Sequence, residues 1–205
     1  FPFVALLASG GHTSIYWVTS PTEAVMMGQT RDDAAGEAYD KVAKMLNLGY
    51  PGGGIIDRLS GRGDGSRIVF PRPFLDKTAF DFSFSGIKTA VKRYIDAHDV
   101  CSDDQIADIA AGFQEAVVEV LCYKAVHAAL EKGCRHLSLV GGVAANSRLR
   151  EKLAADAAEK GISCHIPALK FCGDNAAMIA AAGYHLLTRG DRAGLESDVY
   201  SRVRI

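Results

Sequence analysis

The chain contains 205 residues, of which 48% are hydrophobic, and 23 Lys and Arg balance 24 Asp and Glu. This size and apolar content are sufficient for a single lobe with a buried core, spanning residues 1–205. The balanced charge excludes binding to nucleic acid through bulk charge alone. The short apolar runs exclude a membrane-spanning helix, so we expect no membrane partner.

The N-terminal part predicts an antiparallel meander of strands at residues 3–8, 14–18 and 23–30. Aromatic and β-branched residues favour these strands, and turns separate them at Ser9-Gly10-Gly11-His12-Thr13 and at Ser20-Pro21. The pattern then changes to a helical period from Asp32 onward. One face of this helix carries the apolar residues, and acids in its first turn favour the helix dipole. The expected apolar face is Ala35, Ala38, Tyr39, Val42, Ala43 and Leu46.

Glycines at positions 49 and 52–54 predict a tight loop, followed by a short helix at residues 55–59. Residues 62–84 are expected to be irregular, and a helix should run from Ser85 to about Ile95. Ser102 and Gln105 form a capping box that opens a long apolar helix, which Gly133 should end.

The last third contains two strand-loop-helix units, with strands at residues 137–140 and 163–166 and helices near Ser147 and from Asn175. These strands should be parallel. Three antiparallel strands followed by two such units predict an α/β fold, the ribonuclease-H-like lobe of the actin/Hsp70 (ASKHA) superfamily. We expect helices on both faces of its mixed sheet.

The five cysteines form no C-x-x-C pair, which favours reduced, mostly buried thiols and a cytoplasmic location. They are Cys101, Cys122, Cys134, Cys164 and Cys172. The chain opens on Phe1-Pro2-Phe3 instead of Met and enters an apolar run at once, so we expect a fragment of a longer polypeptide.

Two glycine motifs are candidates for ligand binding. The Ser9–Thr13 turn offers closely spaced N–H groups to a phosphate, but an ordinary hairpin turn explains it equally well. Gly141-Gly142 follows a parallel strand and opens a helix, where α/β folds bind ligands. The alternative is that Asn146 or Ser147 only caps that helix.

Three acids are candidates for polar contacts or metal binding. Asp40 and Asp57 can accept hydrogen bonds from a ligand, although an acid on an amphipathic helix is more often solvated. Asp174 can bind a metal or cap the last helix. The six histidines form no H-x-x-x-H or H-E-x-x-H pair, so the sequence contains no complete metal site.

Seven blocks follow one family's pattern in order: LLASGGHT, DDAAGEAYDKVAK, YPGG, FPRPFLD, DFSFSGIKTAV, GGVAANSRLR and DNAAMIAAAG. Across nearly its whole length the chain resembles the TsaD/Gcp/Kae family, which belongs to the actin–Hsp70 superfamily. The resemblance implies an acyltransferase, a tRNA threonylcarbamoyladenosine synthase. Such an enzyme transfers threonylcarbamoyl from threonylcarbamoyl-AMP to N6 of the adenosine next to the anticodon.

The resemblance also implies roles for individual residues. The phosphate and acyl group of the adenylate would contact the glycine turn and the strand before it, at Leu7, Ala8, Ser9, Gly10 and Gly11. Asp40, Gly53 and Asp57 would line the same pocket. Asn146 would lie beside the adenosine. Asp174 corresponds to the family's carboxylate ligand for one divalent metal, iron or zinc.

The resemblance implies that the family's two histidine ligands lie in an N-terminal lobe, and we expect this chain to be the second, C-terminal lobe without it. The fragment should therefore bind metal poorly and be inactive. The resemblance implies as partners threonylcarbamoyl-AMP or ATP/ADP, tRNA, and TsaB-like and TsaE-like proteins.

Other readings remain open. Another actin/Hsp70-type nucleotide-binding protein would usually carry D-x-G-G-T where Ser9 stands. A non-catalytic TsaB-like scaffold tends to lose residues such as Asn146 and Asp174. An endopeptidase is unsupported, because no zinc-protease helix or Ser/His/Asp order occurs.

Overall fold

The computed structural model describes residues 1–73, 79–100 and 102–198 and divides the chain into two compact units, Phe1–Asp174 and Asn175–Ile205. The second unit contains helix α6 (Ala176–Arg189), which is capped by the Asn175 side chain and ends at Gly190 in the left-handed conformation. The first unit contains the sheet and the other helices.

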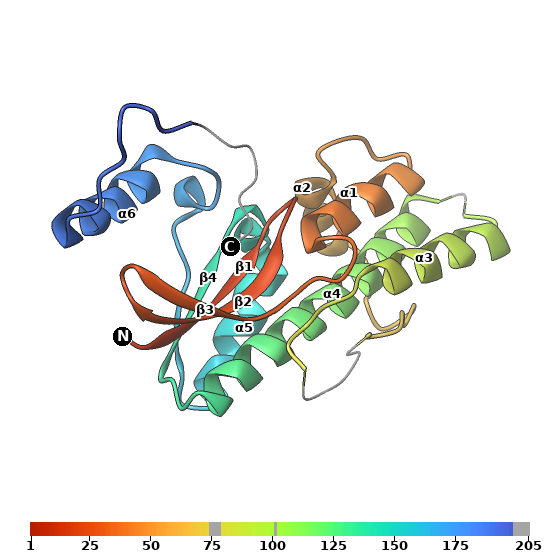
Figure 1. Ribbon diagram of the computed structural model, residues 1–205. Coiled ribbons are helices and arrows are strands. Elements are labelled where there is room, and N and C mark those ends of the chain that lie inside the picture. The colour runs from red at the N-terminus through yellow and green to blue at the C-terminus, as the bar shows by residue number, and fades with distance from the viewer. Residues whose placement is uncertain (74–78, 101, 199–205) are drawn as a thin grey trace. The chain divides into compact units, whose positions relative to one another are not determined.

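The sheet has five strands in the order β3-β2-β1-β4-β5 (Figure 1). The antiparallel meander comprises β1 (Phe3–Ala8), β2 (Thr13–Ser20) and β3 (Glu23–Gln29). On the other side of β1, β4 (His136–Val140) and then β5 (Ser163–His165) pair in parallel. The predicted meander and the two parallel strands are confirmed.

Five α-helices accompany the sheet in the described part of the first unit. They are α1 (Ala35–Met45), α2 (Gly52–Ser60), α3 (Ser85–Ala97), α4 (Asp103–Glu131) and α5 (Ser147–Glu159). Two short 3-10 helices, η1 (Gly142–Ala145) and η2 (Leu169–Phe171), lie in the loops that follow β4 and β5. The predicted apolar face of α1 is buried at all six positions.

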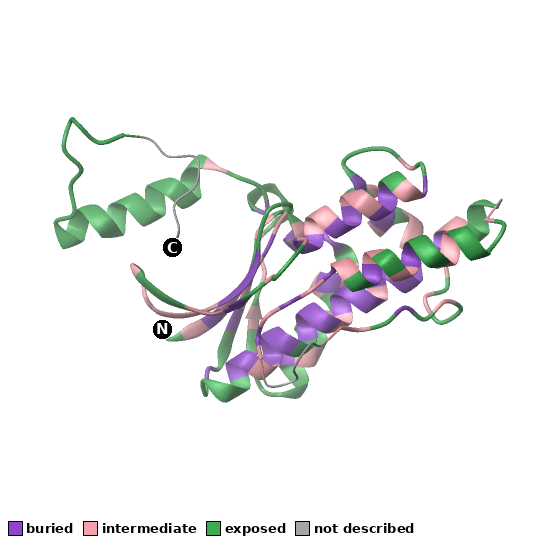
Figure 2. Ribbon diagram, turned by 45° about the vertical axis from the view of Figure 1, so that its right-hand side comes forward, coloured by how far each residue is buried: buried purple, intermediate pink, exposed green. Residues whose placement is uncertain are grey.

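Helix α4 is the centre of the core, and Figure 2 shows buried residues along most of its length. Ser102 and Gln105 cap its start reciprocally, as the sequence predicts. Helices α4 and α5 pack on the face of the sheet that carries Val4, Leu6 and Leu137, all fully buried. Ala5 and Tyr16 on the opposite face are only half-buried. The first unit therefore does not confirm helices on both faces.

Helix α1 begins at Ala35, so Glu37 is the acid in its first turn, and Asp32 and Asp33 precede the helix instead of lying in that turn. The Asp32 carboxylate accepts the backbone N–H of Phe84 at 2.8 Å and the hydroxyl of Ser85 at 2.7 Å, at the start of α3. Asp33 pairs with Lys41 at 2.6 Å, and with α3 through Lys88. Both acids therefore join the start of α1 to α3.

Two other predictions change in detail. Helix α2 begins at Gly52, so residues 52–54 form its first turn and not a loop. Cys122, Cys134 and Cys172 are buried thiols and Cys164 is half-buried, whereas Cys101 lies outside the described residues.

No helix within the described ranges is long and apolar enough to cross a bilayer.

Candidate functional site

A cavity of about 360 Å³ opens at the carboxyl ends of β1 and β4, between the β1–β2 turn, α1, α2 and η1. Parallel strands bring the loops that follow them to one edge of a sheet, which is where α/β folds bind ligands. The wall combines glycines with a few apolar and polar side chains. It consists of Gly10, Gly36, Tyr39, Asp40, Tyr50, Pro51, Gly53, Gly54, Asp57, Gly142, Val143, Ala145 and Asn146.

Five of the nine predicted substrate-binding residues lie in this wall: Gly10, Asp40, Gly53, Asp57 and Asn146. The other four do not line the cavity, although they belong to the same strand and turn as Gly10. They are Leu7, Ala8, Ser9 and Gly11. The fold therefore brings together residues from four separate predicted motifs.

The Ser9–His12 segment is a tight hairpin turn. Its ends are closed by the Ser9 N–H, which donates to the His12 carbonyl at 2.8 Å, and by the His12 N–H, which donates to Ser9 Oγ at 3.0 Å. Gly10 and Gly11 at its tip have no hydrogen-bond partner for their N–H groups among the described residues, and no atom crowds their Cβ positions. The turn can therefore both join two strands and receive an oxyanion.

Asp40 and Asp57 hold the elements of the wall together. Asp40 Oδ1 accepts the Gly52 N–H at 2.7 Å at the start of α2. Asp57 accepts both the N–H and the hydroxyl of Ser147, at 3.0 and 2.9 Å, at the start of α5. Both side chains are half-buried, so the alternative of a purely solvated acid is wrong. Each carboxylate keeps acceptor capacity toward the cavity.

Asn146 is both a helix cap and a wall residue. Its Oδ1 accepts the Leu149 N–H at 2.8 Å, which caps α5, and its Nδ2 donates to Gln114 Oε1 at 2.6 Å. The Tyr39 hydroxyl lies 3.5 Å from both amide groups. Burial raises the pKa of Tyr39, and the negative charges of Asp57 and Glu115 add to that shift, so the phenol remains protonated.

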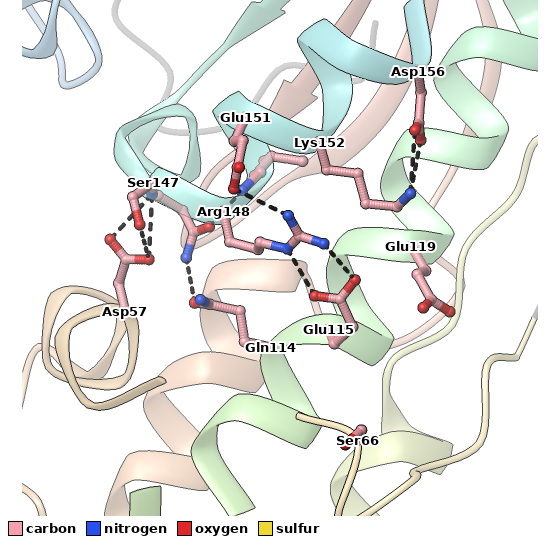
Figure 3. Close-up of polar contacts among 12 residues, drawn as sticks. Asp57, Ser66, Gln114, Glu115, Glu119, Ser147, Arg148, Glu151, Lys152 and Asp156 are labelled. Atoms are coloured by element: carbon pink, nitrogen blue, oxygen red, sulfur yellow. Dashed lines mark hydrogen bonds and ion pairs between the residues drawn. The ribbon is translucent and has the colours of Figure 1, made fainter. Parts of the chain in front are cut away.

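Beside this network, an ion pair ties α4 to the first turn of α5 (Figure 3). Arg148 donates two parallel hydrogen bonds to Glu115, at 2.8 and 2.9 Å, and a third to Glu151 at 3.0 Å. In the same helix, Arg150 Nη1 donates to the carbonyls of Ala144 at 2.9 Å and Pro167 at 3.0 Å. Arg150 therefore joins η1 to the segment that leads to Asp174.

Replacing Glu115 by Gln is expected to lower the free energy of unfolding at pH 7 by about 1 kcal/mol. The Arg148 guanidinium holds the pKa of Glu115 below its usual range. Since the pKa is lower in the folded state, this stabilisation is fully present above the usual pKa of a Glu carboxyl and is lost as the pH falls through the depressed folded-state pKa. Urea unfolding at several pH values measures it.

The control for this variant is Glu159→Gln, which changes an exposed carboxylate for which the described residues show no hydrogen bond or ion pair. We expect the stability of Glu115→Gln to depend less steeply on pH than that of the wild type between about pH 5 and 3. An identical pH slope in the wild type and in Glu115→Gln would contradict the assignment.

Asp174 is exposed at the end of the first unit. The side chain that caps α6 is Asn175, so the alternative in which Asp174 caps that helix is wrong. Within the described ranges, no group of three or more His, Cys, Asp or Glu side chains is placed to hold a metal ion. The described residues therefore do not form a metal centre by themselves, and Asp174 offers a single carboxylate.

Several wall residues were not predicted as site residues. Tyr39 was expected only in the core, and it is indeed 1% exposed, but it also borders the cavity. Gly36 and Tyr50 lie inside motifs that sequence reasoning singled out without giving these residues a role. Gln114, which contacts Asn146, carried no signal, because its partner is 32 positions away.

The strand order and the position of the cavity define a ribonuclease-H-like lobe of the actin/Hsp70 class. The crystal structure of HypF from T. kodakarensis shares the fold, with a TM-score of 0.66 over 89% of this chain and 34% of that protein. The two sequences are only 14% identical, so this likeness concerns the fold alone.

The particular family follows from the sequence comparisons. Residues 1–181 match the family model TsaD, tRNA N6-adenosine threonylcarbamoyltransferase, and the chain belongs to this family. Proteins of that name from Desulforapulum autotrophicum and Geobacter metallireducens are 54% and 50% identical to it, over 100% and 97% of the chain. The chain spans 61% and 58% of the length of these relatives.

Proposed function

We propose that this chain is the nucleotide-binding lobe of a tRNA threonylcarbamoyladenosine synthase. The observation that supports this most directly is the cavity in which Gly10, Gly53 and Asn146, from separate motifs, meet at the carboxyl ends of β1 and β4. Its volume of about 360 Å³ is within the range of small-molecule sites.

The chemistry of the wall suits an adenylate. The unpartnered N–H groups of the Gly10–Gly11 turn are neutral donors for a phosphate, and no Lys, Arg or His lies in the described wall. The carboxylates of Asp40 and Asp57 accept hydrogen bonds from hydroxyl groups, and apolar side chains such as Val143 suit a flat ring.

In the proposed reaction, the N6 amine of a tRNA adenosine attacks the carbonyl carbon of threonylcarbamoyl-AMP. A C–N bond forms, the C–O bond to the phosphate breaks, the amine loses a proton and AMP leaves with the bonding electrons. The glycine turn would stabilise the negative charge on the leaving phosphate through its N–H groups. No residue of this chain is assigned to accept the proton.

A divalent metal, iron or zinc, is part of the proposal for the whole protein. Asp174 would supply one carboxylate ligand, and among the described residues it belongs to no group of three or more His, Cys, Asp or Glu side chains placed to hold a metal. When bound, such a metal polarises a carbonyl oxygen. We also propose cytoplasmic action on tRNA, together with TsaB-like and TsaE-like partner proteins.

Isothermal titration with ADP or AMP tests the pocket. We expect micromolar binding to the wild-type chain and at least about tenfold weaker binding to Gly10→Val, because the added side chain fills the cavity mouth. No atom lies within 4 Å of the Gly10 Cβ position, so the variant should fold normally.

Asn146→Ala should also weaken binding, and Gly173→Ala, at an open position outside the wall, is the control. Equal affinity of the wild type and Gly10→Val would place the nucleotide elsewhere. Absence of binding to the wild type would refute the proposal that this lobe holds the nucleotide by itself.

A further inference from the structure

Gln114 is a polar side chain in an apolar part of the molecule. It lies in the middle of α4 between fully buried positions such as Phe113 and Val117, and it is 4% exposed itself. A buried amide is costly unless it is hydrogen-bonded. Its shortest hydrogen bond within the described part of the chain joins Oε1 to Asn146 Nδ2 at 2.6 Å, so its partner is a residue of the proposed nucleotide pocket.

The direction of this hydrogen bond follows from the groups around Asn146. The backbone N–H of Leu149 can only donate, so the oxygen of the Asn146 amide must face it, at 2.8 Å. The Asn146 nitrogen therefore faces α4, and the Gln114 oxygen must accept from it. One N–H of the Asn146 amide is used in this way and the other remains.

Among the described residues, the remaining N–H has only a weak partner. The Tyr39 hydroxyl is 3.5 Å from Asn146 Nδ2, which is at the limit of a hydrogen bond. Both Tyr39 and Asn146 border the cavity. Asn146 therefore has a side-chain N–H with spare capacity at the edge of the cavity, while its amide oxygen is turned toward the start of α5.

We propose that Gln114 is a positioning residue that fixes the Asn146 amide as a hydrogen-bond donor toward the pocket. The bound ligand then presents an acceptor at this point, such as a ring nitrogen or a hydroxyl oxygen. This inference rests on the proposed function for the identity of the ligand, but the orientation of the amide is a property of the chain alone.

Gln114 is not needed to hold α4 and α5 together, because the neighbouring residue Glu115 already does so. The paired hydrogen bonds between Glu115 and Arg148 tie α4 to α5 at the same level, as Figure 3 shows. The Gln114 contact adds no connection between helices that this ion pair lacks. What it adds is a defined orientation of the Asn146 amide.

The first measurement needs no ligand. In ¹⁵N-labelled chain, hydrogen exchange of the Asn146 side-chain amide should be slow for the proton that is bonded to Gln114. Gln114→Met, which keeps the side-chain length but replaces the amide oxygen by a much weaker acceptor, should remove this protection. Gln114→Glu keeps an acceptor and should retain it. Persistent protection in Gln114→Met would overturn the proposal.

The second measurement is ADP titration. We expect about tenfold weaker binding for Gln114→Met and less than about threefold change for Gln114→Glu. The Asn146→Asp variant should bind ADP at least about tenfold more weakly than the wild type. It should keep the cap of α5, because Asp caps helices as well as Asn does. Glu119→Gln, which breaks the 2.7 Å pair with Arg72 away from Asn146, controls for general effects on α4.

A double-mutant cycle separates positioning from simple loss of stability. In an Asn146→Ala background, Gln114→Met should have no further effect on ADP affinity, because the group it orients is gone. An undiminished effect in that background would refute the proposal. If the wild type binds no ADP but amide protection still depends on Gln114, the proposed function of the lobe fails and the orientation of Asn146 stands.

Discussion

Replacing Gly36 by Ala is expected to lower the free energy of unfolding by about 1–3 kcal/mol and to abolish nucleotide binding. A Cβ atom at Gly36 would lie 2.7 Å from the Ser9 carbonyl oxygen and 2.8 Å from the Cα and N of Gly10. All three are backbone atoms, so relief requires moving α1 or the β1–β2 turn. The 3.1 Å hydrogen bond from the Gly36 N–H to Ser9 would be lost as well.

Gly86→Ala is the matched control, since Gly86 and Gly36 are each the second residue of a helix. No atom lies within 4 Å of a Cβ at Gly86, so we expect no loss of stability, or a gain of up to about 1 kcal/mol from helix propensity. Urea unfolding and ADP titration of both variants measure the difference. Similar stability losses in both would show that the contact with Ser9 does not matter.

The elements that the sequence predicted correctly are those with a regular burial period. In β1, Val4, Leu6 and Ala8 alternate with half-buried residues, as expected of a strand with one face on the core. In α1, Tyr39 and Val42 recur at helical spacing and are buried. Such patterns are local, because each residue's environment follows from its place in the element.

Contacts between distant residues were not predictable in the same way. Asp32 was assigned to the dipole of the nearest helix, but its partner Phe84 is 52 positions away. Likewise, Asp57 binds Ser147, 90 positions along the chain. Sequence alone suggests that such carboxylates are solvated or belong to their own helix. Only the folded arrangement of α1, α2, α3 and α5 shows that Asp32 accepts hydrogen bonds at the start of α3 and Asp57 at the start of α5.

The candidate site contains both residues that local sequence patterns predict and residues that only the folded structure identifies. Glycine-rich turns after strands indicated where a ligand can approach, and Gly10, Gly53 and Asn146 do line one cavity. Gln114 gave no such signal, since it belongs to no recognisable motif and its partner lies in another helix. Its importance follows from the 2.6 Å contact with Asn146, which exists only once α4 and α5 are packed together.

The second large effect is expected for Gly141→Ala, which should destabilise the fold by about 2–4 kcal/mol. Gly141 has a φ of 97°, in the left-handed region, and a Cβ there would lie 2.4 Å from the Ala8 carbonyl oxygen. The strain and the clash act together. Because β1 and β4 are adjacent parallel strands, the chain leaving β4 passes directly beside the end of β1.

Relief of the clash would move η1 away from β1, and Asn146 directly follows η1, so ADP affinity should fall together with stability. The adjacent Gly142→Ala is the control, since no atom lies within 4 Å of its Cβ position and its φ is not positive. Gly142→Ala should leave the free energy of unfolding within about 0.5 kcal/mol of the wild-type value, as for an uncrowded surface substitution.

Any loss of ADP affinity in Gly142→Ala then reflects contact with the ligand, because Gly142 lies in the cavity wall. A Gly141→Ala chain that unfolds at the wild-type urea concentration would contradict the close approach of β4 to β1.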